Sequence, residues 1–129
     1  TLPDSVVMVF ARHHGDIVAG AWLIRGVSTL YGRHWGTFAR HDSLHFEACY
    51  YQGIEYCIEQ GLKIFEPGAQ GEHKIARGFL PTLTRSSHWL TDSRFRAAIS
   101  KYLEQERAAV VDYMEQLRLT SPYKRHSQQ

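Results

Sequence analysis

The sequence predicts an α/β fold: a mixed sheet that opens as an antiparallel meander, then a central helix and a long C-terminal helix. Three β-branched and aromatic runs, separated by turn residues, fill the first third of the chain. The spacing of apolar residues then changes to a helical period. A short apolar run follows that helix directly, which places a fourth strand in or beside the same sheet. The chain has 129 residues, 43% of them hydrophobic, which is enough to form the core of one compact domain.

The meander is expected to begin with a β-hairpin. Residues 6–12 and 17–25 are rich in apolar and β-branched side chains. The four residues between them, His13, His14, Gly15 and Asp16, form a turn-prone cluster of hairpin length. A third strand is expected at residues 28–35.

The central helix is expected to start near Phe46, with Asp42 or Ser43 as its cap and Gly61 at its end. One face is apolar and comprises Phe46, Cys49, Tyr50, Ile54, Cys57 and Ile58. The opposite face is acidic and solvated and comprises Glu47, Tyr51, Glu55 and Glu59. The two cysteines are about 12 Å apart along a helix axis, too far for a disulfide, so both are expected to be reduced.

The second half is expected to contain two further strands and a long helix. The strands are predicted at residues 62–66 and 86–90, and the amphipathic helix at residues 95–117. The domain is then expected to cover residues 1–120, and residues 121–129 to form a disordered tail, because they hold little apolar surface.

Net charge, hydropathy and histidine content indicate which partners and which cellular compartment to expect. A formal net charge of +2 does not favour a nucleic-acid or membrane partner. The absence of a membrane-spanning run and of a secretory leader predicts a soluble, cytoplasmic protein. Eight histidines raise the question of a metal site, but their spacing matches no zinc motif, so no metal is expected. A start at Thr1, directly before a strand, indicates a piece of a longer protein.

A polar, glycine-rich segment follows the predicted fourth strand and is the candidate site. Ends of sheet strands followed by glycines are common places for ligands in α/β proteins. Lys74 and Arg77 share one face if residues 72–77 form a helical turn, and together they suit a phosphate or carboxylate. The structural alternative is that both cations pair with Glu66 and Glu72 on the surface.

Residues 44–89 also carry a series of motifs in a characteristic order. They are Phe46-Glu47, Cys49-Tyr50-Tyr51, Phe65-Glu66-Pro67-Gly68, Glu72-His73-Lys74, Arg77-Gly78-Phe79 and Ser87-His88-Trp89. With these motifs the chain resembles the FemAB-like peptidoglycan biosynthesis/recognition proteins, a branch of the GNAT acyltransferase superfamily. The resemblance covers residues 5–117. It implies a GNAT-like sheet, of which this chain holds the C-terminal part, because the strand and helices that usually precede the meander are not found upstream.

The resemblance implies transfer of an acyl or aminoacyl group to an amine-bearing acceptor, a small molecule or peptide, in peptidoglycan-related metabolism. Such a reaction needs a base and a stabilised oxyanion. The implied bases are His73 and Glu66, and backbone amides near Gln70 and Gly71 would face the oxyanion. The residues implied for donor or substrate binding are Gln70, Gly71, Lys74, Arg77, Glu47 and His88.

The donor implied by the resemblance stays open between acyl-CoA and aminoacyl-tRNA. The segment at residues 36–47 lacks the QxxGxG/A pattern of many CoA-binding relatives, whereas Fem-type enzymes use tRNA as the carrier of their donor. The longer parent protein is expected to carry the activity, and this piece alone to be inactive. Two other readings are a non-catalytic domain that recognises a cell-wall precursor or a protein partner, and a homodimer formed through a sheet surface left bare by the missing upstream elements.

Overall fold

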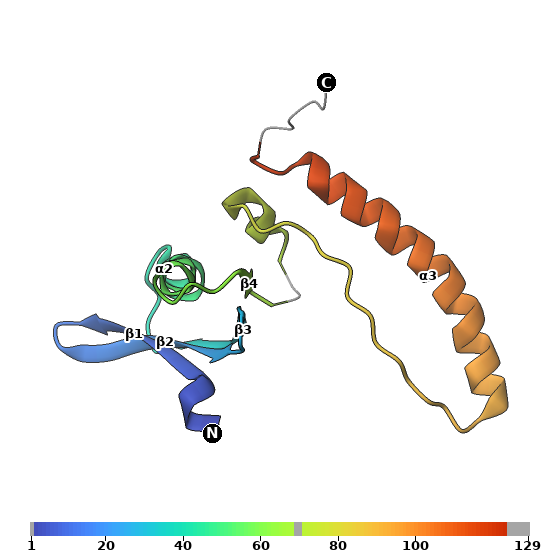
Figure 1. Ribbon diagram of the computed structural model, residues 1–129, viewed down its shortest axis with the longest axis horizontal. Coiled ribbons are helices and arrows are strands. Elements are labelled where there is room, and N and C mark those ends of the chain that lie inside the picture. Colours follow the sequence, from blue (N-terminus) through green and yellow to red (C-terminus); the bar gives the residue numbers. More distant parts are fainter. Residues whose placement is uncertain (1, 69–70, 124–129) are drawn as a thin grey trace. The chain divides into compact units, whose positions relative to one another are not determined.

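A computed structural model describes residues 2–68 and 71–123 (Figure 1). The chain forms two compact units, residues 1–70 and 71–129. The first unit is a mixed four-stranded sheet covered on one face by a helix. Its elements are η1 (Leu2–Ser5), β1 (Val6–His13), β2 (Asp16–Arg25), β3 (Thr29–Thr37), α1 (Leu44–Phe46), η2 (Glu47–Tyr51), α2 (Gln52–Glu59) and β4 (Ile64–Glu66).

The sheet has the strand order β1-β2-β3-β4. The first three strands pair antiparallel, and β4 pairs parallel with β3. The predicted meander, the mixed sheet and the return of the fourth strand after the helix are therefore confirmed. The β4 strand is shorter than the expected residues 62–66, since it begins only at Ile64.

The hairpin between β1 and β2 has a two-residue turn. His13 and Asp16 face each other in the register, and His14 and Gly15 have positive φ angles of 51° and 94°. Positive φ at both central residues is the type I′ geometry, whose twist matches that of paired strands. The predicted hairpin is confirmed.

Each antiparallel pair contains one irregularity. Between β1 and β2 the register moves from Ala11↔Ala19 to Arg12↔Ile17, so Val18 has no residue opposite it. Between β2 and β3 it moves from Trp22↔His34 to Leu23↔Gly32. Such bulges bend a strand and change the direction of a side chain.

Residues 44–59 form consecutive helical segments of which the middle one, η2, is a π-helix. The predicted central helix is confirmed, but its segment Glu47–Tyr51 is π-helical rather than α-helical, and the expected capping by a side chain is not formed. Ser43 is the N-cap residue, but its φ of 63° is left-handed and its side chain makes no capping hydrogen bond. A capping side chain normally needs an extended backbone at this position.

The α2 helix ends just before Gly61, as predicted, and the end is a Schellman motif. The backbone N–H of Gly61 donates to the carbonyl of Ile58, and that of Leu62 donates to the carbonyl of Cys57 at 2.8 Å. Gly61 has a φ of 65°, the left-handed conformation that this motif requires.

The core lies between the helix and one sheet face. Ala21, Leu23, Leu30 and Cys57 form its buried centre, and Phe65 of β4 packs against them. Cys49 and Cys57 are free thiols, as predicted, and burial raises the pKa of Cys57. The acidic face of the helix is exposed as expected. Ile58 was expected in the core but is 75% exposed.

The opposite sheet face is rich in exposed apolar side chains. Met8 and Trp22 face each other across β1 and β2, and Phe10 is 53% exposed. The ring of Trp22 stacks on His34 of β3. The homodimer expected through a bare sheet surface stays a prediction.

The second unit contains η3 (Glu72–Arg77) and the 27-residue helix α3 (Ser93–Leu119). The predicted long helix is confirmed, and the side chain of Asp92 caps it by accepting hydrogen bonds from the backbone of Arg94 and Phe95. The strand predicted at residues 86–90 is wrong: the segment is extended but pairs with no strand among the described residues. Within the expected tail, residues 124–129 lie outside the described residues.

In residues 2–68 and 71–123, no helix combines the length with the hydrophobicity necessary to cross a membrane.

Candidate functional site

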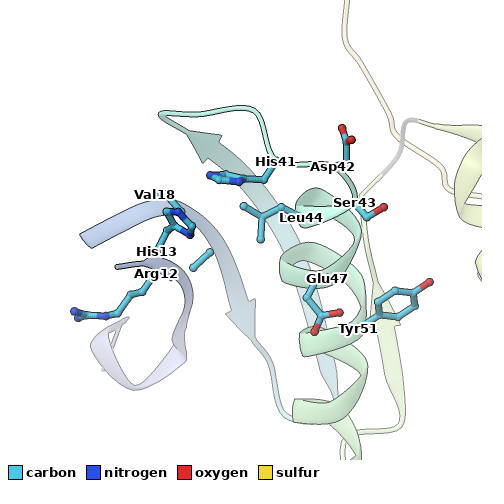
Figure 2. Close-up of a pocket in the computed structure, with 10 residues that line it drawn as sticks. Arg12, His13, Val18, His41, Asp42, Ser43, Leu44, Glu47 and Tyr51 are labelled. Atoms are coloured by element: carbon cyan, nitrogen blue, oxygen red, sulfur yellow. The ribbon is translucent and has the colours of Figure 1, made fainter. Parts of the chain in front are cut away.

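The first unit has a pocket between the β1–β2 hairpin and the start of the central helix (Figure 2). Its volume is about 380 Å³. The lining residues are Ala11, Arg12, His13, Val18, His41, Asp42, Ser43, Leu44, Glu47 and Tyr51. We call it the hairpin–helix pocket.

Irregular backbone surrounds the hairpin–helix pocket. Val18, the residue without an opposite partner in the β1–β2 register, lies in its wall. Ser43 has a positive φ, and the π-helical segment η2 begins at Glu47 and ends at Tyr51, both lining residues. Bulges, left-handed non-glycine residues and π-turns occur preferentially near functional sites.

The pocket has imidazoles on one side and a carboxylate on another. The ring centroids of His13 and His41 are 5.4 Å apart. Glu47 accepts a hydrogen bond from Nε2 of Gln52 at 2.9 Å, which leaves further acceptor capacity on its carboxylate. Figure 2 shows the side chains of His41 and Leu44 directed toward Val18 and His13. In the described part of the chain, no group of three or more His, Cys, Asp or Glu side chains is placed to hold a metal ion.

A second pocket, of about 350 Å³, adjoins the segment between β3 and the helix. Arg40 and Phe38 line it, and it shares His41 and Leu44 with the hairpin–helix pocket. This is the segment in which the sequence lacks the QxxGxG/A pattern.

The residues predicted for the site fall in both units. Glu47 lines the hairpin–helix pocket. Glu66 is the last residue of β4, is exposed, and stands opposite Tyr31 in the register. Gln70 lies outside the described residues.

The structure brings the other predicted loop residues into one helical turn. Gly71 is the N-cap of η3 with a φ of 102°, and η3 contains His73, Lys74 and Arg77. Nη1 of Arg77 donates to the backbone carbonyl of His73 at 2.9 Å. Residues 72–77 form the helical turn on which a shared face of Lys74 and Arg77 depends; it is a 3-10 helix, in which residues three apart lie on the same side.

His88 belongs to the exposed extended segment before α3. Its Nε2 is 3.0 Å from Oγ of Ser86. A role for His88 in donor or substrate binding stays a prediction.

A hydrogen bond connects η3 to the long helix. The hydroxyl of Tyr113 on α3 donates to the carboxylate of Glu72. This bond is the main cause that raises the pKa of Tyr113, because ionisation would remove the donated proton and place two negative charges together.

We therefore expect Tyr113 to ionise only above the ordinary tyrosine pKa of about 10. Its contribution to stability is fully present below that value and is lost as the pH rises through the raised pKa. The ionisation of Tyr113 can be isolated by measuring tyrosinate absorbance from pH 8 upward in the wild type and in Tyr113→Phe and taking the difference. Tyr102→Phe, an exposed position on the same helix, is the matched control. A difference curve with its midpoint at or below the ordinary value would contradict the prediction.

The sequence did not single out most of the hairpin–helix pocket. His13 and His41 were weighed only as metal ligands, and Val18 and Leu44 read as ordinary apolar residues. The sequence feature that could have indicated this pocket was the histidine-rich hairpin turn together with a histidine before the helix. Their proximity depends on the twist of the hairpin over the helix start, which spacing along the chain does not encode.

Together these features define a mixed α/β protein with an exposed pocket beside its central helix and a basic turn ahead of its long helix. The chain belongs to the FemAB-like family. The model of this family matches residues 1–125 and carries the description peptidoglycan biosynthesis/recognition. The resemblance inferred from the motifs is thus confirmed. No curated protein and no solved structure matches the chain.

Proposed function

We propose that this protein transfers an acyl or aminoacyl group to an amine-bearing acceptor in peptidoglycan-related metabolism. The observation that carries the proposal is the η3 turn, which holds an imidazole, His73, beside the cationic side chains of Lys74 and Arg77. Membership of the FemAB-like family supports the metabolic setting. Lys74 and Arg77 are half-buried and His73 is exposed, so a base and anion binders occur within one short segment.

The reaction sets clear demands on the site. The acceptor nitrogen forms a bond to the donor carbonyl carbon and loses a proton, while the bond from that carbon to the leaving group breaks. His73 is the base that best suits neutral pH, and Glu66 at the end of β4 is the second candidate. The leaving group, a CoA thiolate or a ribose alkoxide of tRNA, takes up a proton.

Lys74 and Arg77 are proposed to bind the phosphates of the donor or a substrate carboxylate. Both donor classes carry phosphate, so either suits a pair of cations. The GNAT-like assignment of the sheet belongs to this proposal and is supported by the meander, the central helix and the parallel β4. Two free cysteines are compatible with a cytoplasmic, reducing setting.

Calorimetric titration of the intact parent protein expected from the sequence, with acetyl-CoA and, separately, with aminoacyl-tRNA, tests the proposal. We expect one donor to bind and the double variant Lys74→Ala, Arg77→Ala to lose roughly tenfold or more in affinity, because two charge-assisted contacts are removed. The matched control is Arg94→Ala, Lys101→Ala, which removes the same charge from the surface of α3. His73→Ala should keep donor binding and lose turnover. Unchanged turnover in His73→Ala would exclude this base.

The second candidate function is recognition of a cell-wall precursor without turnover. It is favoured by the family description, which names recognition beside biosynthesis. The same titration separates the two functions: binding of a peptidoglycan precursor, without binding of either donor and without turnover, would establish recognition.

A further inference from the structure

The hairpin–helix pocket holds several side chains that the proposed reaction does not use. Of its lining residues, the resemblance implied a role only for Glu47. The pocket belongs to the first unit, whereas the η3 turn belongs to the second. Its chemistry therefore has to be derived from its own walls.

The first wall is anionic. Glu47 stands at the first position of the π-helical segment and is exposed to solvent. Its carboxylate is held by Nε2 of Gln52, which in turn contacts Glu55 at 3.2 Å. A carboxylate oriented in this way still has free acceptor positions and suits a primary ammonium group.

The opposite wall consists of imidazoles. His13 ends β1 and His41 precedes the helix, and their rings are 5.4 Å apart. In either tautomer each ring has an N–H donor, so the pair suits an anionic oxygen such as a carboxylate. Arg12 is also in the lining, but its Nη1 donates to the backbone carbonyl of Gly15 in the hairpin turn at 3.2 Å, so it is not assigned to the ligand.

The space between these walls is apolar. Ala11, Val18 and Leu44 line it, and Val18 occupies its place because of the bulge in β2. A short aliphatic chain fits such a surface, because contact with apolar side chains removes both from water. The volume of about 380 Å³ accommodates a small molecule.

We propose that the hairpin–helix pocket binds a small aliphatic amino-carboxylate, with its ammonium group on Glu47 and its carboxylate on His13 and His41. That such a ligand is the acceptor of the transfer reaction rests on the proposed function; the binding itself does not. The irregular backbone around the pocket, at Val18, Ser43 and η2, fixes these groups in place.

Three probes of equal chain length test the proposal on the 129-residue chain. ε-Aminocaproate carries both charged groups, hexylamine lacks the carboxylate, and hexanoate lacks the amine. We expect ε-aminocaproate to bind roughly threefold to fivefold more tightly than either of the others, the range that an exposed charge pair supports. In ¹⁵N-resolved NMR titrations, the shifts should concentrate at residues 11–18 and 41–47.

Two variants assign the ends of the ligand. Glu47→Gln should reduce the affinity for ε-aminocaproate to that of hexanoate, and His41→Gln should reduce it toward that of hexylamine. The controls are Glu59→Gln, on the exposed face of the same helix, and His34→Gln, which lies against Trp22 on the other sheet face. Both should bind like the wild type.

The proposal would be overturned if ε-aminocaproate bound no more tightly than hexylamine or hexanoate. NMR shifts centred outside residues 11–18 and 41–47, or equal losses of affinity in the control variants, would also overturn it. The comparison of the three probes needs no variant, so a folding defect does not weaken it. If acyl transfer were observed and none of the three probes bound in the pocket, only this inference would be wrong. Probe binding in the pocket with no donor binding would instead remove the proposed function.

Discussion

Replacing Leu30 by alanine is expected to lower the free energy of unfolding of the first unit by about 2 to 5 kcal/mol. Leu30 is fully buried on β3, with 0% of its surface exposed, and packs in the cluster formed with Leu23 and Cys57. Truncation removes apolar contacts and leaves a cavity that neighbouring strands fill only in part. We expect no other substitution proposed for this chain to cost as much stability.

Urea unfolding followed by tryptophan fluorescence measures this loss. A Trp89→Phe background confines the signal to Trp22 and Trp35, the two tryptophans of the first unit. Val27→Ala is the matched aliphatic control, since Val27 is 102% exposed and its truncation should change the stability by less than about 0.5 kcal/mol. A loss below about 1 kcal/mol in Leu30→Ala would mean that this core is not closely packed.

The second large effect is expected at Gly53, in the middle of the central helix. Alanine in place of glycine normally stabilises a helix by about 1 kcal/mol. Here a Cβ atom would lie 2.5 Å from Cζ and 2.6 Å from Cε1 of Phe65. Phe65 is itself packed against the core, so its ring cannot move freely. We expect Gly53→Ala to destabilise the unit by about 1 to 3 kcal/mol.

A double-mutant cycle with Phe65→Leu tests the cause. Removing the ring should make Gly53→Ala much less costly, so the two substitutions should be strongly non-additive. Gly36→Ala is the control, because a Cβ atom added to Gly36 on β3 would meet no atom within 4 Å and the residue has no positive φ. Additive effects of Gly53→Ala and Phe65→Leu would contradict close packing of α2 on β4.

The close approach at Gly53 also explains how the candidate pocket is positioned. Contact between Gly53 and Phe65 of β4 holds the middle of the helix close to the sheet, and the Schellman motif at Gly61 directs the chain into β4. At the other end of the helix, η2 places Glu47 and Tyr51 in the pocket wall. A loss of packing at Gly53 is therefore expected to disturb the hairpin–helix pocket as well.

Elements with local signals could be predicted from the amino-acid sequence. Turn residues at His14 and Gly15 specified the first hairpin, a 3.6-residue period identified the two main helices, and Gly61 marked a helix end. The ordered motifs of residues 44–89 identified the family, because they are read along the chain without reference to its fold.

Tertiary packing, in contrast, determines which residues share a pocket. The bulge at Val18, the left-handed Ser43 and the π-turn at Glu47 have no local sequence signature, because each arises where a strand or helix adjusts to its neighbours. For the same reason the strand predicted at residues 86–90 was wrong: an extended run becomes a strand only when another strand accepts its hydrogen bonds. His13 and His41 meet because sheet twist and helix packing bring together side chains that are 28 positions apart in the sequence.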